Sequence, residues 1–146
     1  MAADRKDKTR QVWLETLEKH RRDFDAADND KYWSVALDTA SRDEIIAIQN
    51  DKLQVLTPFL YENSDFYRRR FDRLGLAPTD IQTVDDLPKW PVVDKAEMME
   101  DAIAHPPYGT YCTNDDDIWA ERGWMLFSSS GSTGTPRVFR YTHTDR

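Results

Sequence analysis

Apolar side chains recur at helical spacing through the first half of the chain. The strongest stretch follows Ser41, and its apolar positions are Ile45, Ile48, Leu53, Leu56 and Leu60. Ser41 and Glu44 have the spacing of a capping box, in which each side chain accepts a hydrogen bond from the other residue's amide. The pattern predicts a helix that begins after Ser41. Pro58 falls inside it and, lacking an amide hydrogen, is expected to kink or end it.

Two more helices are predicted further along the chain. One begins after Ser64, a good N-terminal cap, and stops at Gly75, with Phe66, Tyr67, Phe71 and Leu74 facing inward. The other begins at a second capping box, Asp94 to Glu97, and runs to about Ile103. Between them, Thr83 is expected to cap a single short turn before Pro88. The run Arg68, Arg69 and Arg70 points to different sides of its helix and is interpreted as a solvated face.

The first 30 residues carry mixed charges and few apolar positions. Val12, Leu14, Leu17, Arg21 and Phe24 suggest a helix with a narrow apolar stripe, which the sequence DAADND then breaks. We interpret residues 1–30 as a charged, solvated arm or helix, and residues 31–146 as the folded remainder.

Strand character appears only after Ile118. The run WMLF, residues 124–127, predicts a buried strand, and the alternation from Val138 to Thr142 predicts a second one. Thr144 and Asp145 resemble the start of a further helix. The expected fold is therefore α/β, or α+β within this stretch, with a helical first part followed by a β-hairpin.

Composition and charge narrow the classes of partner. The formal net charge is −7 over 146 residues, which disfavours nucleic acid as a partner because phosphate contacts need clustered Lys and Arg. Cys112 is the only cysteine, and a single thiol is typical of a reducing compartment. The N-terminal sequence MAADRKDKTRQ lacks a signal-peptide core, and no apolar run reaches the length of a membrane span. We expect a cytoplasmic protein that binds neither nucleic acid nor membrane.

The acidic stretch Asn114 to Asp117 is a candidate metal site. It lacks the alternating ligand positions and the distal Glu of a calcium loop, so a solvated turn is the favoured interpretation. We assign no metal ligand in this chain.

A segment rich in hydroxyl groups and glycine, FSSSGSTGTPR, lies at residues 127–137 between the two predicted strands. Ser and Thr hydroxyls donate to phosphate oxygens, and glycine lets successive amides approach an anion closely. Arg137 would add a cation with a geometry suited to phosphate. A polar turn and an anion-binding cradle both fit these residues.

The segment SSGSTGTPR, residues 129–137, closely resembles the phosphate-loop signature of the adenylate-forming acyl- and aryl-CoA synthetases. Arg137 stands where the family usually has Lys, so the charge is kept. From about Tyr32 onward the chain also resembles the N-terminal region of phenylacetate–CoA ligases. The blocks that carry this likeness, in order, are Tyr32–Trp33, Ser41–Glu44, Gln49, Tyr61–Arg70, Asp86–Pro88, Pro91–Lys95 and Pro107–Gly109.

The resemblance implies a two-step reaction on a carboxylic acid, expected to be aromatic. The acid attacks the α-phosphorus of ATP, pyrophosphate leaves, and the thiol of coenzyme A then displaces AMP to give a thioester. In the family the loop holds the β- and γ-phosphates, with Mg²⁺ nearby. Carried onto this chain, the phosphate-binding residues are Ser129, Ser130, Gly131, Ser132, Thr133, Gly134, Thr135 and Arg137. The implied partners are the acid, ATP and coenzyme A, and a homodimer is left open.

The resemblance covers the start of the family's large N-terminal domain, a helical region that leads into its first strands. The segments that bind adenine and ribose, the Mg²⁺-linked Glu and the C-terminal catalytic Lys follow later in the family. We therefore expect residues 1–146 alone to be inactive, as an incomplete domain that ends just after the phosphate loop. The alternatives are a non-catalytic adaptor, one half of a split enzyme, or an adenylating enzyme with an acceptor other than coenzyme A.

Overall fold

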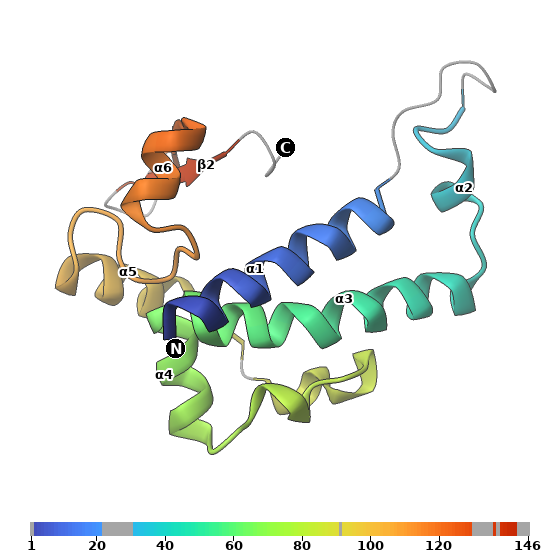
Figure 1. Cartoon of the computed structure of the whole chain (residues 1–146), viewed down its shortest axis with the longest axis horizontal. Helices are drawn as coiled ribbons and strands as arrows, with labels where there is room; N and C mark the ends of the chain where they lie inside the picture. Colours follow the sequence, from blue (N-terminus) through green and yellow to red (C-terminus); the bar gives the residue numbers. More distant parts are fainter. Residues whose placement is uncertain (1, 22–30, 91, 130–135, 137, 143–146) are drawn as a thin grey trace.

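The computed structural model describes residues 2–21, 31–90, 92–129, 136 and 138–142. Within them the chain forms helices first and a small antiparallel sheet last (Figure 1). The elements are α1 (Ala2–Lys19), α2 (Val35–Asp38), α3 (Arg42–Asn63), α4 (Asp65–Leu74), two 3-10 turns (Pro78–Asp80 and Val84–Lys89), α5 (Lys95–Ala104), α6 (Asp116–Arg122), β1 (Met125–Ser128) and β2 (Val138–Tyr141). The expected α+β arrangement is confirmed.

Helix α1 lies antiparallel along α3, as Figure 1 shows. The ring of Trp13 stacks on that of Phe59, with 6.0 Å between the centroids. Polar contacts tie the pair near both ends of α1, where Arg5 lies 3.7 Å from Glu62 and Lys19 lies 2.7 Å from Asp51. The predicted helix is present as α1, but it is docked on α3 and is not a free arm. The stacking of Trp13 and the ion pairs at both ends together dock α1 on α3.

Helix α3 begins as predicted. The Glu44 amide donates to the Ser41 hydroxyl at 3.3 Å, and the Ser41 amide donates to the Glu44 carboxylate at 2.7 Å. Of the two effects predicted for Pro58, a kink or an end, the end does not occur, because the helix continues through Pro58 to Asn63. The carbonyl that Pro58 leaves without a helical donor belongs to Gln54, an exposed residue, where water can replace the missing bond.

The core gathers where α3, α4 and the 3-10 turns meet. Phe59, Phe66, Phe71 and Ile81 are buried, and the ring of Phe71 lies 5.2 Å from that of Trp90. The Ser64 cap and the left-handed Gly75 stop of α4 are both confirmed. Leu74 is 47% exposed, contrary to its predicted inward position, because the last turn of α4 extends past the core.

Two short 3-10 turns connect α4 to α5. Thr83 is the N-terminal cap residue of the second turn, as predicted, but the turn continues through Pro88 to Lys89. The Asp86 carboxylate accepts hydrogen bonds from Lys89 at 2.7 Å and from the amides of Gln82 and Thr83, both at 3.0 Å. These bonds, that of Lys89 foremost, hold the pKa of Asp86 well below its usual range.

Helix α5 starts at its predicted cap, because the Glu97 amide donates to Asp94 at 2.8 Å. The Glu97 carboxylate instead pairs with Arg70 of α4, so only the Asp94 half of the predicted box forms. The acidic stretch before α6 is a helix start and not merely a solvated turn. Asp115 caps α6 by accepting the Ile118 amide at 3.1 Å.

The predicted hairpin is confirmed, with Met125 opposite Tyr141 and Ser128 opposite Val138. The prediction that its first strand is buried is wrong, since Leu126 is 55% and Phe127 49% exposed. Among the described residues the sheet has two strands, which leaves little to cover these side chains. The predicted helix start at Thr144 and Asp145 lies outside the described residues.

Within the described part of the chain, no helix is both long enough and apolar enough to cross a lipid bilayer.

The α1–α3 pair yields a test that depends on pH. Lys19 and His20 both hydrogen-bond to Asp51, and these bonds, that of Lys19 foremost, lower the pKa of the Asp51 carboxyl. A carboxyl with a lowered folded-state pKa contributes stability above its unfolded pKa of about 3.9 and loses it as the pH falls through the folded value. We expect Asp51→Asn to cost about 0.5–1 kcal/mol at pH 6 and progressively less as the pH falls below the unfolded pKa of about 3.9.

Urea unfolding at several pH values measures this difference. Glu100→Gln is the matched control, since it removes an exposed carboxylate that has no recorded partner among the described residues. A difference between parent and Asp51→Asn that stays constant down to pH 3 would show that the carboxylate does not stabilise the α1–α3 pair.

Candidate functional site

The hairpin places both ends of the predicted phosphate-binding segment. Ser128 and Val138 form the last strand pair, and Ser129 and Pro136 are the described residues of the segment itself. Ser129 is half-buried and its carbonyl accepts a hydrogen bond from the Ser128 hydroxyl at 3.2 Å, while Pro136 is exposed. The remaining predicted site residues lie outside the described residues: Ser130, Gly131, Ser132, Thr133, Gly134, Thr135 and Arg137. Their role as phosphate ligands stays a prediction.

The strand that follows the segment is held by a cluster that the sequence did not indicate. The guanidinium of Arg140 lies 3.8 Å from the ring centroid of Tyr108, 4.4 Å from that of Trp119 and 5.8 Å from that of Trp124. We call Arg140 and these three rings the Arg140 cage. Alternation along the strand could have marked Arg140 as facing one side, but nothing local names the rings opposite it.

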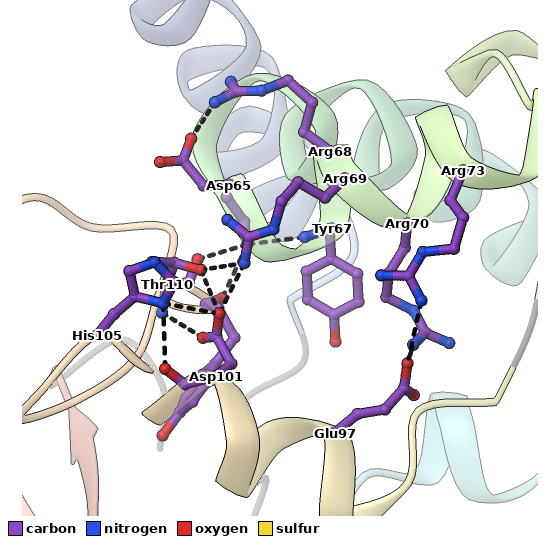
Figure 2. A network of polar contacts seen from close by, with 12 residues as sticks. Asp65, Tyr67, Arg68, Arg69, Arg70, Arg73, Glu97, Asp101, His105 and Thr110 are labelled. Carbon is purple, nitrogen blue, oxygen red and sulfur yellow. Dashed lines mark hydrogen bonds and ion pairs between the residues drawn. The ribbon is translucent and has the colours of Figure 1, made fainter. Parts of the chain in front are cut away.

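A polar network joins α4, α5 and the turn that carries Tyr108 (Figure 2). Its centre is Asp101, whose side chain is 4% exposed. The Asp101 carboxylate accepts hydrogen bonds from Arg69 at 2.7 Å and from the amide and hydroxyl of Thr110 at 2.5 Å and 2.8 Å. His105 lies 3.4 Å away. The Thr110 carbonyl in turn accepts from the Phe66 amide at 3.2 Å.

The prediction of a solvated face for the arginine run is wrong for Arg70, whereas Arg69 is exposed although its guanidinium is paired. Arg70 is 5% exposed, pairs with Glu97 and donates to the Val92 carbonyl at 2.9 Å. Arg69 reaches Asp101, as above, and Arg68 pairs locally with Asp65. Consecutive helix positions do point to different sides, but α5 occupies two of those sides.

A groove of about 430 Å³ lies between α4 and α5. Its charged lining residues are three arginines and three carboxylates, namely Arg69, Arg70, Arg73, Glu97, Glu100 and Asp101. Cations and carboxylates are equal in number and most are paired with one another, so the groove offers no strong field of either sign. On the core side of α4, burial raises the pKa of Tyr67, whose ring lies 6.1 Å from that of Trp90.

The N-terminal helix also reaches toward the hairpin end of the molecule. Arg10 donates to the Thr113 carbonyl at 2.6 Å, just before α6 begins. Burial lowers the pKa of Arg10, although the nearby charge of Asp115 opposes this. Among the described residues, no group of three or more His, Cys, Asp or Glu side chains could hold a metal ion.

Comparison with curated proteins finds phenylacetate-coenzyme A ligases. The chain is 31% identical over 109 residues to the one from Thermus thermophilus and 34% identical over 109 residues to the one from Escherichia coli. Each match covers 75% of this chain, but only 22% and 23% of the respective relatives. No protein-family model matches the chain.

Solved structures give the same result for the fold. A 2-hydroxyisobutyryl-CoA ligase in the postadenylation state, in complex with 2-HIB-AMP, matches with a TM-score of 0.72 at 25% identity, over 92% of this chain and 27% of that one. The same ligase in complex with 2-HIB-AMP and CoA in the thioesterification state matches with a TM-score of 0.71 at 28% identity, over 83% and 24%.

The fold is thus one found in acyl-CoA ligases of the adenylate-forming superfamily. Over 109 residues the chain is similar to phenylacetate-coenzyme A ligases, which confirms the resemblance predicted from its sequence. It spans about a quarter of the length of the relatives that it matches.

The Asp101 network depends on a glycine, which gives a second test. Gly109 has a φ of +74°, and a Cβ there would lie 2.6 Å from an Asp101 carboxylate oxygen and 2.8 Å from the Tyr111 ring. Gly75 also has a positive φ, +64°, but its Cβ would meet nothing within 4 Å. We expect Gly75→Ala to cost about 1 kcal/mol for the left-handed backbone alone, and Gly109→Ala to cost at least about 1–2 kcal/mol more.

Thermal and urea unfolding of the two variants measure the difference directly. Equal losses for the two substitutions would mean that the turn can shift away from Asp101 without cost.

Proposed function

We propose that this chain forms part of an enzyme that ligates a carboxylic acid to coenzyme A through an acyl-adenylate. The observation that carries the proposal is the similarity to phenylacetate-coenzyme A ligases over 109 residues. The structural match to a ligase solved with an acyl-AMP and with CoA supports it. On this proposal, residues 31–146 are the first part of the adenylate-forming domain.

The chemistry explains why a loop of this composition is needed. A carboxylate oxygen forms a bond to the α-phosphorus of ATP while the bond to pyrophosphate breaks, so one anion approaches a polyanion. Amides, hydroxyls and a cation placed around the phosphates neutralise that charge. In this proposal the amides and hydroxyls of the segment from Ser129 to Thr135 hold the β- and γ-phosphates, and Arg137 supplies the cation.

The thiol of coenzyme A then attacks the acyl carbon, the bond to AMP breaks, and the thioester forms. An arylacetic acid is the proposed substrate, because the curated relatives are named for phenylacetate. Mg²⁺ is usually held by one or two carboxylates together with the phosphates of the substrate, and we assign it no ligand among the described residues.

Two measurements on a protein of the relatives' full length that carries this chain separate the alternatives. ATP–pyrophosphate exchange stimulated by phenylacetate tests adenylation, and release of the coenzyme A thioester tests the acceptor. Exchange without thioester would favour a different acceptor. An absence of acid-stimulated exchange across arylacetic, benzoic and short aliphatic acids would contradict the proposed enzyme and favour an adaptor.

Replacing the cation of the segment should weaken the use of ATP. We expect Arg137→Ala in the full-length protein to lower kcat/KM for ATP by roughly 10- to 150-fold, the loss of a charge-assisted phosphate contact of about 1.5–3 kcal/mol. Arg137→Lys keeps the charge and should retain most activity. Steady-state exchange kinetics with ATP as the varied substrate measure both variants. An unchanged kcat/KM for ATP in Arg137→Ala would show that Arg137 is not a phosphate ligand.

Residues 1–146 in isolation should not adenylate an acid. In-line attack needs a held ribose, an oriented carboxylate and a metal in addition to a phosphate loop, and we assign none of these to the described residues. The exposed strand side chains Leu126 and Phe127 should instead promote dimers or aggregates. Exchange assays and light scattering on the purified chain test both expectations. Turnover above that of an Arg137→Ala control would refute the assignment of the catalytic machinery to other parts of the protein.

A further inference from the structure

The Arg140 cage brings four separate parts of the chain to one side chain. Arg140 lies on β2, Trp124 directly precedes β1, Trp119 lies on α6, and Tyr108 lies in the turn after α5. The ring of Tyr108 also meets that of Trp124 edge-on, with 6.2 Å between the centroids. The cage therefore joins both strands of the hairpin to the helical part of the molecule.

The guanidinium of Arg140 is a buried cation with few polar partners among the described residues. Its side chain is only 10% exposed, yet the carboxylate that pairs with it among the described residues, Asp116, is 3.9 Å away and fully exposed. An ion pair with an exposed carboxylate at that distance contributes little to stability. The Arg140 Nε is buried and finds no hydrogen-bond partner among the described residues. Among the described residues, the contacts of this buried cation are thus three aromatic rings and one long ion pair, and cation–ring contacts strengthen when water is excluded.

The position of the cage along the chain relates it to the proposed phosphate loop. Arg140 follows Arg137 by three residues, and it stands opposite Leu126, two residues before the end of β1. Both ends of segment 129–137 leave from this short sheet. A two-stranded hairpin is marginally stable by itself. Something outside the hairpin must therefore fix its position, and the cage does so on the strand that follows the loop.

We propose that Arg140 is a positioning residue for ATP: its caged guanidinium fixes β2 against α6 and the Tyr108 turn and so sets the exit of segment 129–137. This rests on the function proposed above. Arg140 does not touch the substrate in this proposal. Its loss should let the hairpin shift, which weakens binding of the phosphates and leaves the site for the acid unaffected.

The test uses Arg140→Met, Arg140→Lys and the matched control Arg42→Met in the full-length protein. Arg42 is exposed at the start of α3, far along the chain from the hairpin. We expect Arg140→Met to raise KM for ATP on the order of tenfold while KM for the acid changes less than about twofold. Arg140→Lys keeps a cation over the rings and should lie between parent and Arg140→Met. Arg42→Met should match the parent.

A second readout does not need activity. Trypsin cleaves after Arg137, and mass spectrometry follows that cut in each variant. Looser anchoring of β2 should speed this cut several-fold in Arg140→Met and less in Arg140→Lys, with no change in Arg42→Met. If Arg140→Met fails to fold, Arg140→Lys and Trp124→Leu carry the same comparison, because each weakens the cage by a smaller step.

The outcomes separate this inference from the proposed function. A parent without acid-stimulated exchange contradicts the proposed function, and the trypsin comparison then decides whether Arg140 anchors the segment. An active parent whose Arg140 variants keep the parental KM for ATP overturns the inference alone. An equal fall in kcat for all substrates with unchanged KM for ATP also overturns it, since that is the signature of a merely structural residue.

Discussion

The buried carboxylate of Asp101 is the contact on which the arrangement of the second half of the chain depends. A charge that is 4% exposed is costly unless it is paired and hydrogen-bonded. Asp101 meets that requirement with groups from two other segments, Arg69 of α4 and Thr110 beyond the turn. It thereby fixes α5, α4 and the turn in one geometry. The turn carries Tyr108, which covers Arg140 on β2, so the position of the hairpin depends on a carboxylate three elements away.

Local rules predicted the helix starts well. Ser41, Ser64 and Asp94 all cap the helices expected of them, because an N-terminal cap needs only its own side chain and an amide three residues on. The stop at Gly75 is local in the same sense. The Asp115 cap was overlooked because neighbouring acidic residues made the stretch resemble a solvated turn. In each of these cases the decisive atoms lie within a few residues of one another.

Contacts between residues far apart in the chain could not be predicted from the sequence. Arg69 and Arg70 belong to a charged run that looks solvated, and only the placement of α5 shows that their partners are Asp101 and Glu97. The docking of α1 was missed for a similar reason, since Trp13 needs Phe59 opposite it. In the candidate site, the prediction that residues 129–137 bind phosphate rests on a sequence signature and on no geometry. The Arg140 cage was unpredictable because its rings come from positions 108, 119 and 124, in three different segments.

The contact between Arg10 and the Thr113 carbonyl couples the first helix to the far end of the molecule. Helix α1 packs mainly on α3, yet through Arg10 it also helps to hold the residues that lead into α6, and Trp119 of α6 is a wall of the Arg140 cage. Docking of α1 and ordering of the hairpin are therefore coupled. The coupling free energy is reciprocal, so each of the two stabilises the other by the same amount. The N-terminal helix is charged and lies far from the hairpin in sequence. It nevertheless helps to hold the hairpin in place. Its removal would therefore affect α6 and, through Trp119, strand β2 as well as α3.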